Sequence, residues 1–335
     1  MEIRKVQITG GSSFVVTLPK DWAESLKIKK NDPLGLIVQP DGTLLITKDI
    51  SEAQIQRVRK FDVTTITEPT YLFRLLIGSY ISGYTTIEIF SKSRLPASVR
   101  MVVRDFTQMT IGPEVVEETD TTIILKDLLN PMEMPFANTI KRMYVVVKNM
   151  YFDAMNVLET RNMSLADDVI ARDNDVDRLH WLIARQTNII LKNTNLSRKM
   201  ALSTSMVVNT YIISRIIERI GDHAVRCVEN IKKIEEPELP DDLLDAIRAA
   251  VTLSLSLFDN SIVSFFKSDI RGAHRNIEQV LKLEELCEGI NVLAMRQDPA
   301  AAVALRNIAE SIRRAGEYSG DISENVINYL VEQKP

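Results

Sequence analysis

The spacing of hydrophobic and polar residues divides the chain into three parts, and the first part is rich in short strands. Strands are predicted at Ile3–Ile8, Phe14–Leu18, Leu34–Val38 and Leu44–Thr47, with a short helix over Pro19–Leu26 and turns at 10–13 and 40–43. This order predicts two hairpins around a helix. A piece of about 50 residues cannot bury a core alone, so we expect it to need a partner chain.

The second part, residues 51–131, alternates between strand and helix patterns. Strands are predicted at 58–67 and 85–90, helices at 68–82 and 96–110, and a closing hairpin at 114–118 and 121–125. This order indicates a small α+β domain. Because the segment contains no histidine, no cysteine and no glycine fingerprint, we expect a connector that orients the terminal domains, with ligand sensing as an alternative.

The third part, residues 132–335, has helical periodicity to its end. Apolar residues recur at three- and four-residue steps, as in the stripe Leu202, Met206, Ile213, Ile217, Ile220, Ala224, Cys227 and Ile231. The segment EPELPDD at 236–242 separates two helical halves, about 132–235 and 241–332. The predicted fold is therefore multidomain: a β-rich domain over 1–50, an α+β connector over 51–131 and an all-α domain over 132–335.

Composition narrows the functional classes. The chain is 45% hydrophobic and 26% charged with a formal net charge of −4, so any nucleic-acid binding must come from a local patch. Cys227 and Cys287, the two cysteines, lie in helical patterns and suit buried thiols in a reducing compartment. We find neither a signal-peptide core nor an apolar stretch of about 18 residues, which predicts a cytoplasmic protein without membrane insertion.

Two acidic pairs with i,i+4 spacing form a candidate metal site. They are Asp173 with Asp177, and Glu218 with Asp222. Such pairs share one helix face, and Glu229 returns to within about 20° of Glu218. If the two helices pack antiparallel, four or five carboxylates converge, and a multivalent cation would offset their repulsion. Two solvated acidic faces are the alternative interpretation.

Residues 218–224 (ERIGDHA) and 173–179 (DNDVDRL) resemble the PhoU family of phosphate-uptake regulators over roughly 132–335. The resemblance implies a bundle of two three-helix repeats in which Glu/Asp-x-x-x-Asp motifs bind iron or zinc. Asp173, Asp177, Glu218 and Asp222 match the first repeat's motif, and we expect them to hold iron, zinc or manganese. His180, one heptad after Asp173, and Glu229 are further candidate ligands.

The second repeat departs from that pattern. Glu284, Glu288 and Glu317 align with acidic positions of the first repeat, but Arg313 stands where Glu218 stands. An arginine there supplies the positive charge itself, so we expect this second, degenerate site to bind metal weakly or not at all.

No catalytic constellation is identified. A ferritin-like di-iron site needs a second acid-x-x-His, which the helices lack, and neither cysteine has a histidine on its helix face. His223 lies about 140° around the helix from Glu218, which favours a packing or hydrogen-bonding role. We therefore predict a protein that is not an enzyme.

The N-terminal part resembles the SpoVT/AbrB family over about residues 2–49, in the order of its strands and in Leu18-Pro19-Lys20 and Asp41-Gly42. The resemblance implies a swapped-hairpin barrel, formed by two subunits, that binds double-stranded DNA. Residues 1–49 hold seven Lys or Arg against six Asp or Glu. Arg4, Lys5 and Lys20 are the candidate phosphate contacts. A dimerisation module without DNA contact is the alternative.

Together the two resemblances imply a homodimeric, DNA-binding regulator of phosphate uptake and phosphate homeostasis that also docks on the phosphate transporter's ATPase. Two alternatives stay open at this stage. One is an adaptor that docks on the ATPase without binding DNA. The other is a metal-dependent hydrolase in which clustered carboxylates activate water.

Overall fold

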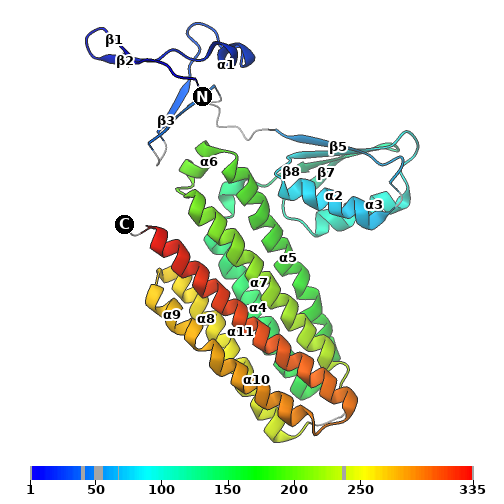
Figure 1. Cartoon of the computed structure of the whole chain (residues 1–335). Helices are drawn as coiled ribbons and strands as arrows, with labels where there is room; N and C mark the ends of the chain where they lie inside the picture. Colours follow the sequence, from blue (N-terminus) through cyan, green and yellow to red (C-terminus); the bar gives the residue numbers. More distant parts are fainter. Residues whose placement is uncertain (1, 39–41, 49–55, 67, 236–238, 334–335) are drawn as a thin grey trace. The chain divides into compact units, whose positions relative to one another are not determined.

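The structure is a computed structural model that describes residues 2–38, 42–48, 56–66, 68–235 and 239–333. Its contacts divide the chain into two compact units, Met1–Ile55 and Gln56–Pro335. The predicted turn at 40–43 and the predicted interruption at 236–242 lie partly outside the described residues. The N-terminal, sheet and helical regions follow in the predicted order along the chain (Figure 1).

The first unit consists of two hairpins and one short helix. Strands β1 (Gln7–Thr9) and β2 (Ser13–Val15) form the first hairpin, α1 (Lys20–Ser25) follows, and β3 (Gly35–Val38) pairs with β4 (Leu44–Thr47). Gly10 and Gly11 have positive φ angles of 62° and 83°, which the tight first turn requires. The prediction that β1 begins at Ile3 was wrong. Within one chain the described strands form two separate two-stranded sheets and no closed barrel.

The first unit leaves most of its hydrophobic side chains exposed. Ile37 is the only buried hydrophobic residue among those described in this unit. Ile3, Phe14 and Val38 are 81%, 77% and 76% exposed, respectively. Apolar side chains exposed at this density are typical of surfaces that another chain covers.

The second unit begins with a four-stranded sheet in the order β5-β6-β8-β7. Its strands are β5 (Val58–Asp62), β6 (Thr86–Phe90), β7 (Pro113–Glu118) and β8 (Thr122–Asp127); β5 and β6 are parallel, and the other neighbours are antiparallel. Helices α2 (Pro69–Ile81) and α3 (Ala97–Gln108) pack against the sheet and share its core (Figure 1). Strand β5 ends earlier than the predicted residue 67, because the Asp62 carboxylate accepts from the Thr64 amide and starts a turn.

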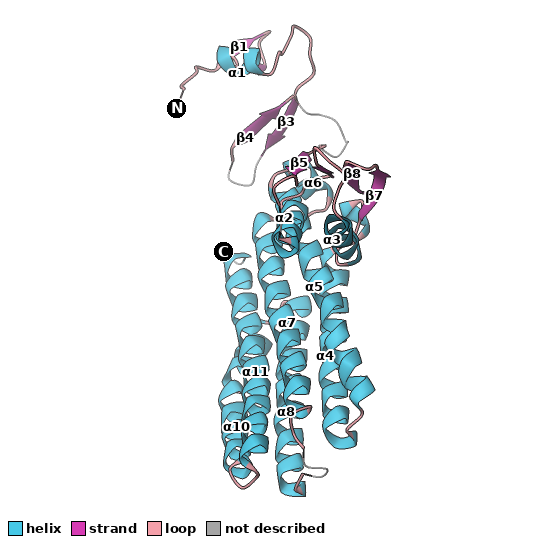
Figure 2. Ribbon diagram, turned by 90° about the vertical axis from the view of Figure 1, so that its right-hand side faces the viewer, coloured by secondary structure: helices cyan, strands magenta, loops and turns pink. Residues whose placement is uncertain are grey.

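The rest of the second unit is a bundle of long helices (Figure 2). Its members are η1 (Pro131–Glu133), α4 (Phe136–Thr160), α5 (Met163–Leu191), α6 (Thr194–Lys199), α7 (Thr204–Ile231), α8 (Asp241–Lys267), α9 (Ile270–Glu278), α10 (Val280–Ala294) and α11 (Pro299–Gln333). The side chains of Asn162 and Ser203 cap α5 and α7 at their N-termini. The two helical repeats are α4-α5-α7 and α8-α9-α10-α11, and one continuous core runs through both.

Each repeat has a glycine where two of its helices approach each other closely. A Cβ atom on Gly221 would lie 3.3 Å from Val147 Cγ2, and one on Gly316 would overlap Leu283 Cδ2. Only glycine allows helices to come this close without displacing a neighbour. The equivalent placement of both glycines supports the predicted internal repeat.

Among the described helices, α8 alone is long and apolar enough to span a membrane by length and composition. Half of its apolar window is buried inside the bundle, against α10, α11 and the core. A core helix of a soluble protein meets the same criterion, so this feature is weak support for a membrane span.

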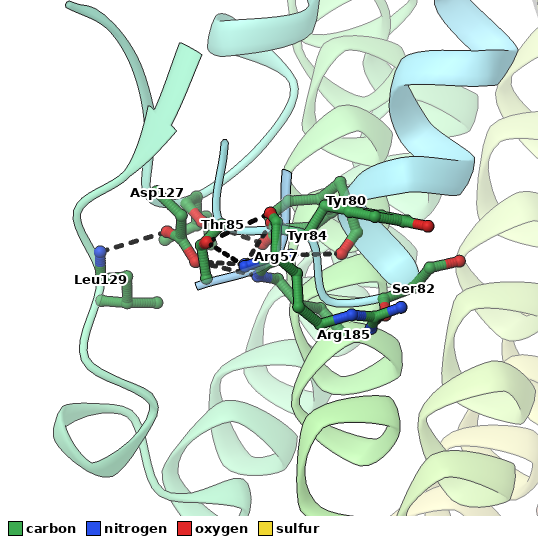
Figure 3. A network of polar contacts seen from close by, with 9 residues as sticks. Arg57, Tyr80, Ser82, Tyr84, Thr85, Asp127, Leu129 and Arg185 are labelled. Atoms are coloured by element: carbon green, nitrogen blue, oxygen red, sulfur yellow. Dashed lines mark hydrogen bonds and ion pairs between the residues drawn. The ribbon is translucent and has the colours of Figure 1, made fainter. Parts of the chain in front are cut away.

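Arg185 of α5 joins the sheet region to the bundle (Figure 3). Its guanidinium is 2% exposed and pairs with the equally buried carboxylate of Asp127, at the end of β8. It also donates to the carbonyl oxygens of Tyr80 and, at 2.8 Å, Tyr84. Arg57 lies next to this network: its backbone amide donates to Thr85 Oγ1 at 2.9 Å. A buried cation with three acceptor groups fixes α5 against the sheet.

Candidate functional site

The four carboxylates of the first repeat converge where α5 packs against α7. The negative charges of Asp177, Asp222 and Glu229 raise the pKa of Asp173. The charges of Asp222, Asp177 and Asp173, in that order of size, raise the pKa of Glu218. Asp173 thus lies near Glu229 and Asp222, whereas Asp177, further along α5, lies near Asp222. The two helices are therefore antiparallel. The cluster lies beside Gly221, where a Cβ atom would be 3.6 Å from Asp173 Oδ1.

Burial and mutual repulsion raise the pKa values of this cluster. Burial is the largest cause at every member; it raises the pKa of Glu218 to about 7 and those of Asp173 and Asp177 to about 6. The pKa of Asp222 is also raised by burial, although Arg226, Arg215 and Arg219 partly offset this rise. In the folded chain the nearby positive charge is therefore too small to offset the burial and mutual repulsion of the ionised carboxylates.

Two oxygens of the cluster have no hydrogen-bond partner although they are buried: Asp173 Oδ1 and Glu218 Oε2. The other oxygen of Glu218 accepts from Arg215 Nη1 at 2.7 Å. Unpaired buried carboxylate oxygens are costly, and a cation would satisfy them. The donor set therefore fits a hard or borderline metal ion. As the side chains stand, no three His, Cys, Asp or Glu residues in the described part of the chain are arranged to hold one ion.

Both histidines near the cluster are buried and engaged by aromatic rings. His180 Nδ1 lies 3.0 Å from Ser214 Oγ, and its ring stacks on Tyr211 at a centroid distance of 5.7 Å. His223 lies against Tyr318. Burial lowers the pKa of each imidazole to about 4, with nearby arginines adding to the effect. Both are therefore neutral at pH 7. The predicted packing role of His223 agrees with this position.

The equivalent region of the second repeat is neutralised by its own arginines. Arg313 pairs with Glu317 and, at 2.8 Å, with Glu310, and Arg314 bridges the same two glutamates at 3.0 and 3.1 Å. Burial lowers the pKa of Arg313, but the nearby carboxylates of Glu310, Glu317 and Glu284 raise it, and the net shift is upward. Glu288 is exposed and accepts from the Asn291 side chain at 3.1 Å. The arginines of this region therefore compensate the charge of its acidic side chains.

Two regions of the chain match models of known protein families. Residues 140–231 match the PhoU domain, and residues 7–54 match the family described as "Antidote-toxin recognition MazE, bacterial antitoxin". The chain therefore contains a PhoU domain and, at its N-terminus, a MazE/AbrB-like domain.

Curated relatives and solved structures agree with this assignment for the PhoU region. "Phosphate-specific transport system accessory protein PhoU homolog 1" of Thermotoga maritima is 24% identical over 194 residues, which are 56% of this chain and 82% of that protein. A PhoU homolog of Xylella fastidiosa is 26% identical over 53% of this chain and 75% of its own length.

Two solved structures share the helical fold. PhoU from Streptococcus pneumoniae gives a TM-score of 0.51 at 16% identity, covering 61% of this chain and 96% of that one. PhoU from Pseudomonas aeruginosa gives 0.53 at 21% identity, covering 61% and 98%. The predicted PhoU-like bundle is confirmed.

The MazE/AbrB-like domain holds the three predicted DNA contacts at its surface. Arg4 and Lys5 precede β1 rather than lying within it, and Arg4 pairs with Glu2. Lys20 opens α1, is 83% exposed and lies 3.6 Å from Glu24. The ion pairs of Arg4 and Lys20 are solvent-exposed, and such pairs contribute little to stability.

Sequence reasoning missed two arginines of the second unit. Arg215, three residues before Glu218, forms the ion pair that holds this ligand candidate; an acid and a base at i,i+3 were the signal available. Arg185 lies inside an apolar helical run, and nothing in the sequence identifies its acceptors, which are far away along the chain.

Proposed function

We propose that this protein is a DNA-binding regulator of phosphate uptake and phosphate homeostasis. The observation that carries the proposal is the joining of a MazE/AbrB-like domain to a PhoU domain in one chain. The relatives of the PhoU region are named as accessory proteins of phosphate-specific transport. None of these names describes an enzymatic activity, which favours a regulator over an enzyme.

DNA binding would require two subunits. The hydrophobic side chains exposed on both hairpins support a homodimer in which each chain covers the other's strands. With a net charge of about +1 on each N-terminal domain, affinity must come from two domains acting together, through Arg4, Lys5 and Lys20. Each phosphate contact releases counterions, so binding should weaken steeply as salt increases.

The PhoU domain would bind a multivalent cation: iron, zinc or manganese. Asp173, Asp177, Glu218 and Asp222 would hold it, with Glu229 at the edge of the cluster and His180 close by on α5. Such an ion would supply positive charge to the buried carboxylates. Glu218 would take part through Oε2, the oxygen without a hydrogen-bond partner, while Oε1 keeps Arg215.

One experiment tests both halves of the proposal. Purified dimer is titrated with promoter DNA of phosphate-uptake genes at several salt concentrations, and elemental analysis is performed on the same preparation. We expect a mobility shift that weakens with salt, a flatter salt slope in the Arg4→Gln/Lys5→Gln variant, and bound metal. Lys48→Gln, on the same domain but hydrogen-bonded to the carbonyls of Leu26 and Lys27, is the control.

The absence of any shift at low salt, in protein confirmed as dimeric, would instead favour an adaptor that docks on the phosphate transporter's ATPase. The near-neutral charge of the N-terminal domain is the observation that keeps this second function in view. Turnover of phosphoesters or polyphosphate by metal-loaded protein would contradict both and indicate a hydrolase.

A further inference from the structure

A cavity of about 470 Å³ lies between the C-terminal part of α8 and the helix α9, two neighbouring helices of the second repeat (Figure 1). Ser268, whose φ of 54° is left-handed, ends α8, and Asp269 caps α9 by accepting from the Gly272 amide at 2.9 Å. This tight turn folds α9 back along α8. We call the space between them the α8–α9 cavity; its polar lining includes Ser264, Asp269, Arg275, Asn276 and Glu278.

The cavity lies where the second repeat departs from the first. In the first repeat α5 continues without a break over 29 residues. The equivalent stretch of the second repeat is divided into α9 and α10 at Gln279, and Gln279 lines the cavity. No proline or glycine occurs from residue 273 to residue 288. The interruption therefore coincides with the cavity and not with a helix-breaking residue.

Asn276 lines the cavity with a buried side chain that has one unpaired oxygen. The residue is 2% exposed, and its Nδ2 donates to the Leu257 carbonyl at 2.8 Å and to Ser323 Oγ at 3.0 Å. Because a carbonyl oxygen only accepts, the contact with Leu257 fixes which end of the amide is nitrogen. Asn276 Oδ1 has no hydrogen-bond partner. A buried amide oxygen without a donor is costly, so this atom needs a donor from a bound molecule.

A ligand reaches this oxygen past side chains that can move. Arg275 and Gln279 line the same cavity, and both are exposed. Exposed side chains change rotamer within nanoseconds, so these two can turn aside as a ligand enters. Asn276 itself is held in place by its bonds to α8 and α11. The cavity thus combines a fixed acceptor with a mobile rim.

Gly272 leaves room between two further oxygens of the cavity. A Cβ atom on this glycine would lie 2.5 Å from Asp269 Oδ2 and 3.0 Å from Ser264 Oγ, and Ser264 is buried. Any side chain larger than that of glycine would therefore crowd this part of the wall. The capping bond of α9 uses Asp269 Oδ1, so Oδ2 can accept from a ligand while the cap stays intact.

The charged groups of the cavity are two carboxylates and one guanidinium. The carboxylates belong to Asp269 and Glu278, and Glu278 Oε1 lies 3.6 Å from His274 Nε2. Arg275 forms no ion pair with any described residue. Carboxylates only accept and a guanidinium only donates, so a complementary ligand carries ammonium groups and one anionic group. A nucleotide or free phosphate fits less well, because two carboxylates would repel its negative charge.

We propose that the α8–α9 cavity binds a free amino acid with a basic side chain, such as lysine. Its α-ammonium group would donate to Asn276 Oδ1 and Asp269 Oδ2, its carboxylate would bind Arg275, and its side-chain cation would face Glu278. The single positive net charge of this ligand complements two carboxylates and one arginine. The volume of the cavity lies within the roughly 300–1,000 Å³ of small-molecule sites. This site goes beyond the proposed function, because none of its residues belongs to the acidic cluster or to the N-terminal domain.

The test is a calorimetric titration of the full-length chain with L-lysine. Asp269→Asn removes the negative charge but keeps a capping oxygen, since asparagine caps helices as well as aspartate does. Its matched control is Asp298→Asn, the same change at the residue before α11 that accepts from the Ala300 amide at 2.9 Å. We expect Asp269→Asn to lower the affinity for lysine about tenfold and Asp298→Asn to bind like the wild type.

A second variant changes the cation of the cavity. Arg275→Gln removes the partner of the ligand's carboxylate, and we expect it also to lower the affinity about tenfold. Arg271→Gln is the control, because Arg271 is exposed on the same helix and, like Arg275, forms no ion pair with any described residue. Without lysine, both variants should melt at the temperature of the wild type.

Further probes separate the ligand classes. L-alanine should bind more weakly than lysine, and L-glutamate should not bind. Putrescine or inorganic phosphate binding as tightly as lysine would assign the cavity to a lone amine or a lone anion and overturn the amino acid. No binding of lysine by the wild type at up to about 10 mM, or equal affinity of Asp269→Asn, Arg275→Gln and the wild type, would also overturn it. A chain that binds lysine but shifts no DNA and holds no metal would refute only the proposed function.

Discussion

Replacing Glu218 by glutamine should stabilise the metal-free protein at neutral and alkaline pH. The pKa of Glu218 is raised from 4.5 to about 7, chiefly by burial, and its side chain is 10% exposed. At about 1.4 kcal/mol for each pKa unit, the ionised carboxylate costs roughly 3 kcal/mol. Water at the edge of the cluster screens part of this cost, so we expect a gain of about 2 kcal/mol in the Glu218→Gln variant at pH 8.

The sign of the pH dependence follows from the direction of this shift. A carboxyl group that holds its proton more tightly in the folded chain stabilises the fold below its unfolded pKa, and this contribution is lost as pH rises through the folded pKa. The free energy of unfolding of metal-free wild type should therefore fall between about pH 4.5 and pH 8. Wild type and Glu218→Gln should converge at the acidic end, where both side chains are neutral.

Urea unfolding in the presence of chelator, followed by circular dichroism across this pH range, measures the effect. Glu285→Gln is the control, because Glu285 is exposed on α10 and forms no ion pair with a described residue. Adding metal should reverse the order, since the wild type would gain stability from the ion and the variant would gain less. A variant that is less stable than the wild type at pH 8 without metal would refute the repulsion argument.

Three further changes test other parts of the structure. Arg185→Met should lower the free energy of unfolding by about 3–5 kcal/mol, because it leaves the Asp127 carboxylate buried and unpaired. Adding Asp127→Asn should restore part of this loss. Equal stability of the single variant and the wild type would contradict the expectation. Gly316→Ala should destabilise by about 1–3 kcal/mol because its Cβ would overlap Leu283, whereas Gly289→Ala, with nothing within 4 Å, should not; melting temperatures decide. Glu317→Gln should leave the metal content unchanged whereas Asp222→Asn should lower it, and anomalous scattering that shows equal clusters in both repeats would rule this out.

Most of the fold could be predicted, because its local patterns are strong. The helical periodicity, the Pro69 helix start and the closing hairpin of the sheet each depend on residues close together in sequence. One error, the end of strand β5, occurred where a short-range contact outweighed β propensity. Strand β5 stops at Asp62 because that side chain turns the backbone toward Thr64, although the following residues are β-branched.

The candidate site was predictable as a set of acids but not as an arrangement. The i,i+4 spacing placed Asp173 with Asp177 and Glu218 with Asp222, and the antiparallel packing of α5 on α7 brings both pairs together. The i,i+3 spacing allowed an ion pair between Glu218 and Arg215 but did not single it out, since a glutamate between several arginines has many possible partners. Whether these acids bind metal stays a prediction.

The buried Arg185 also restricts how this protein can be divided for experiments. A fragment of residues 132–335 would keep this arginine but lose Asp127, Tyr80 and Tyr84, the groups that accept its hydrogen bonds. Its guanidinium would then face either water or an apolar gap on α5, eight residues from Asp177. A fragment that starts at residue 56 keeps every acceptor, so it is the smaller piece in which measurements of the acidic cluster would represent the intact chain.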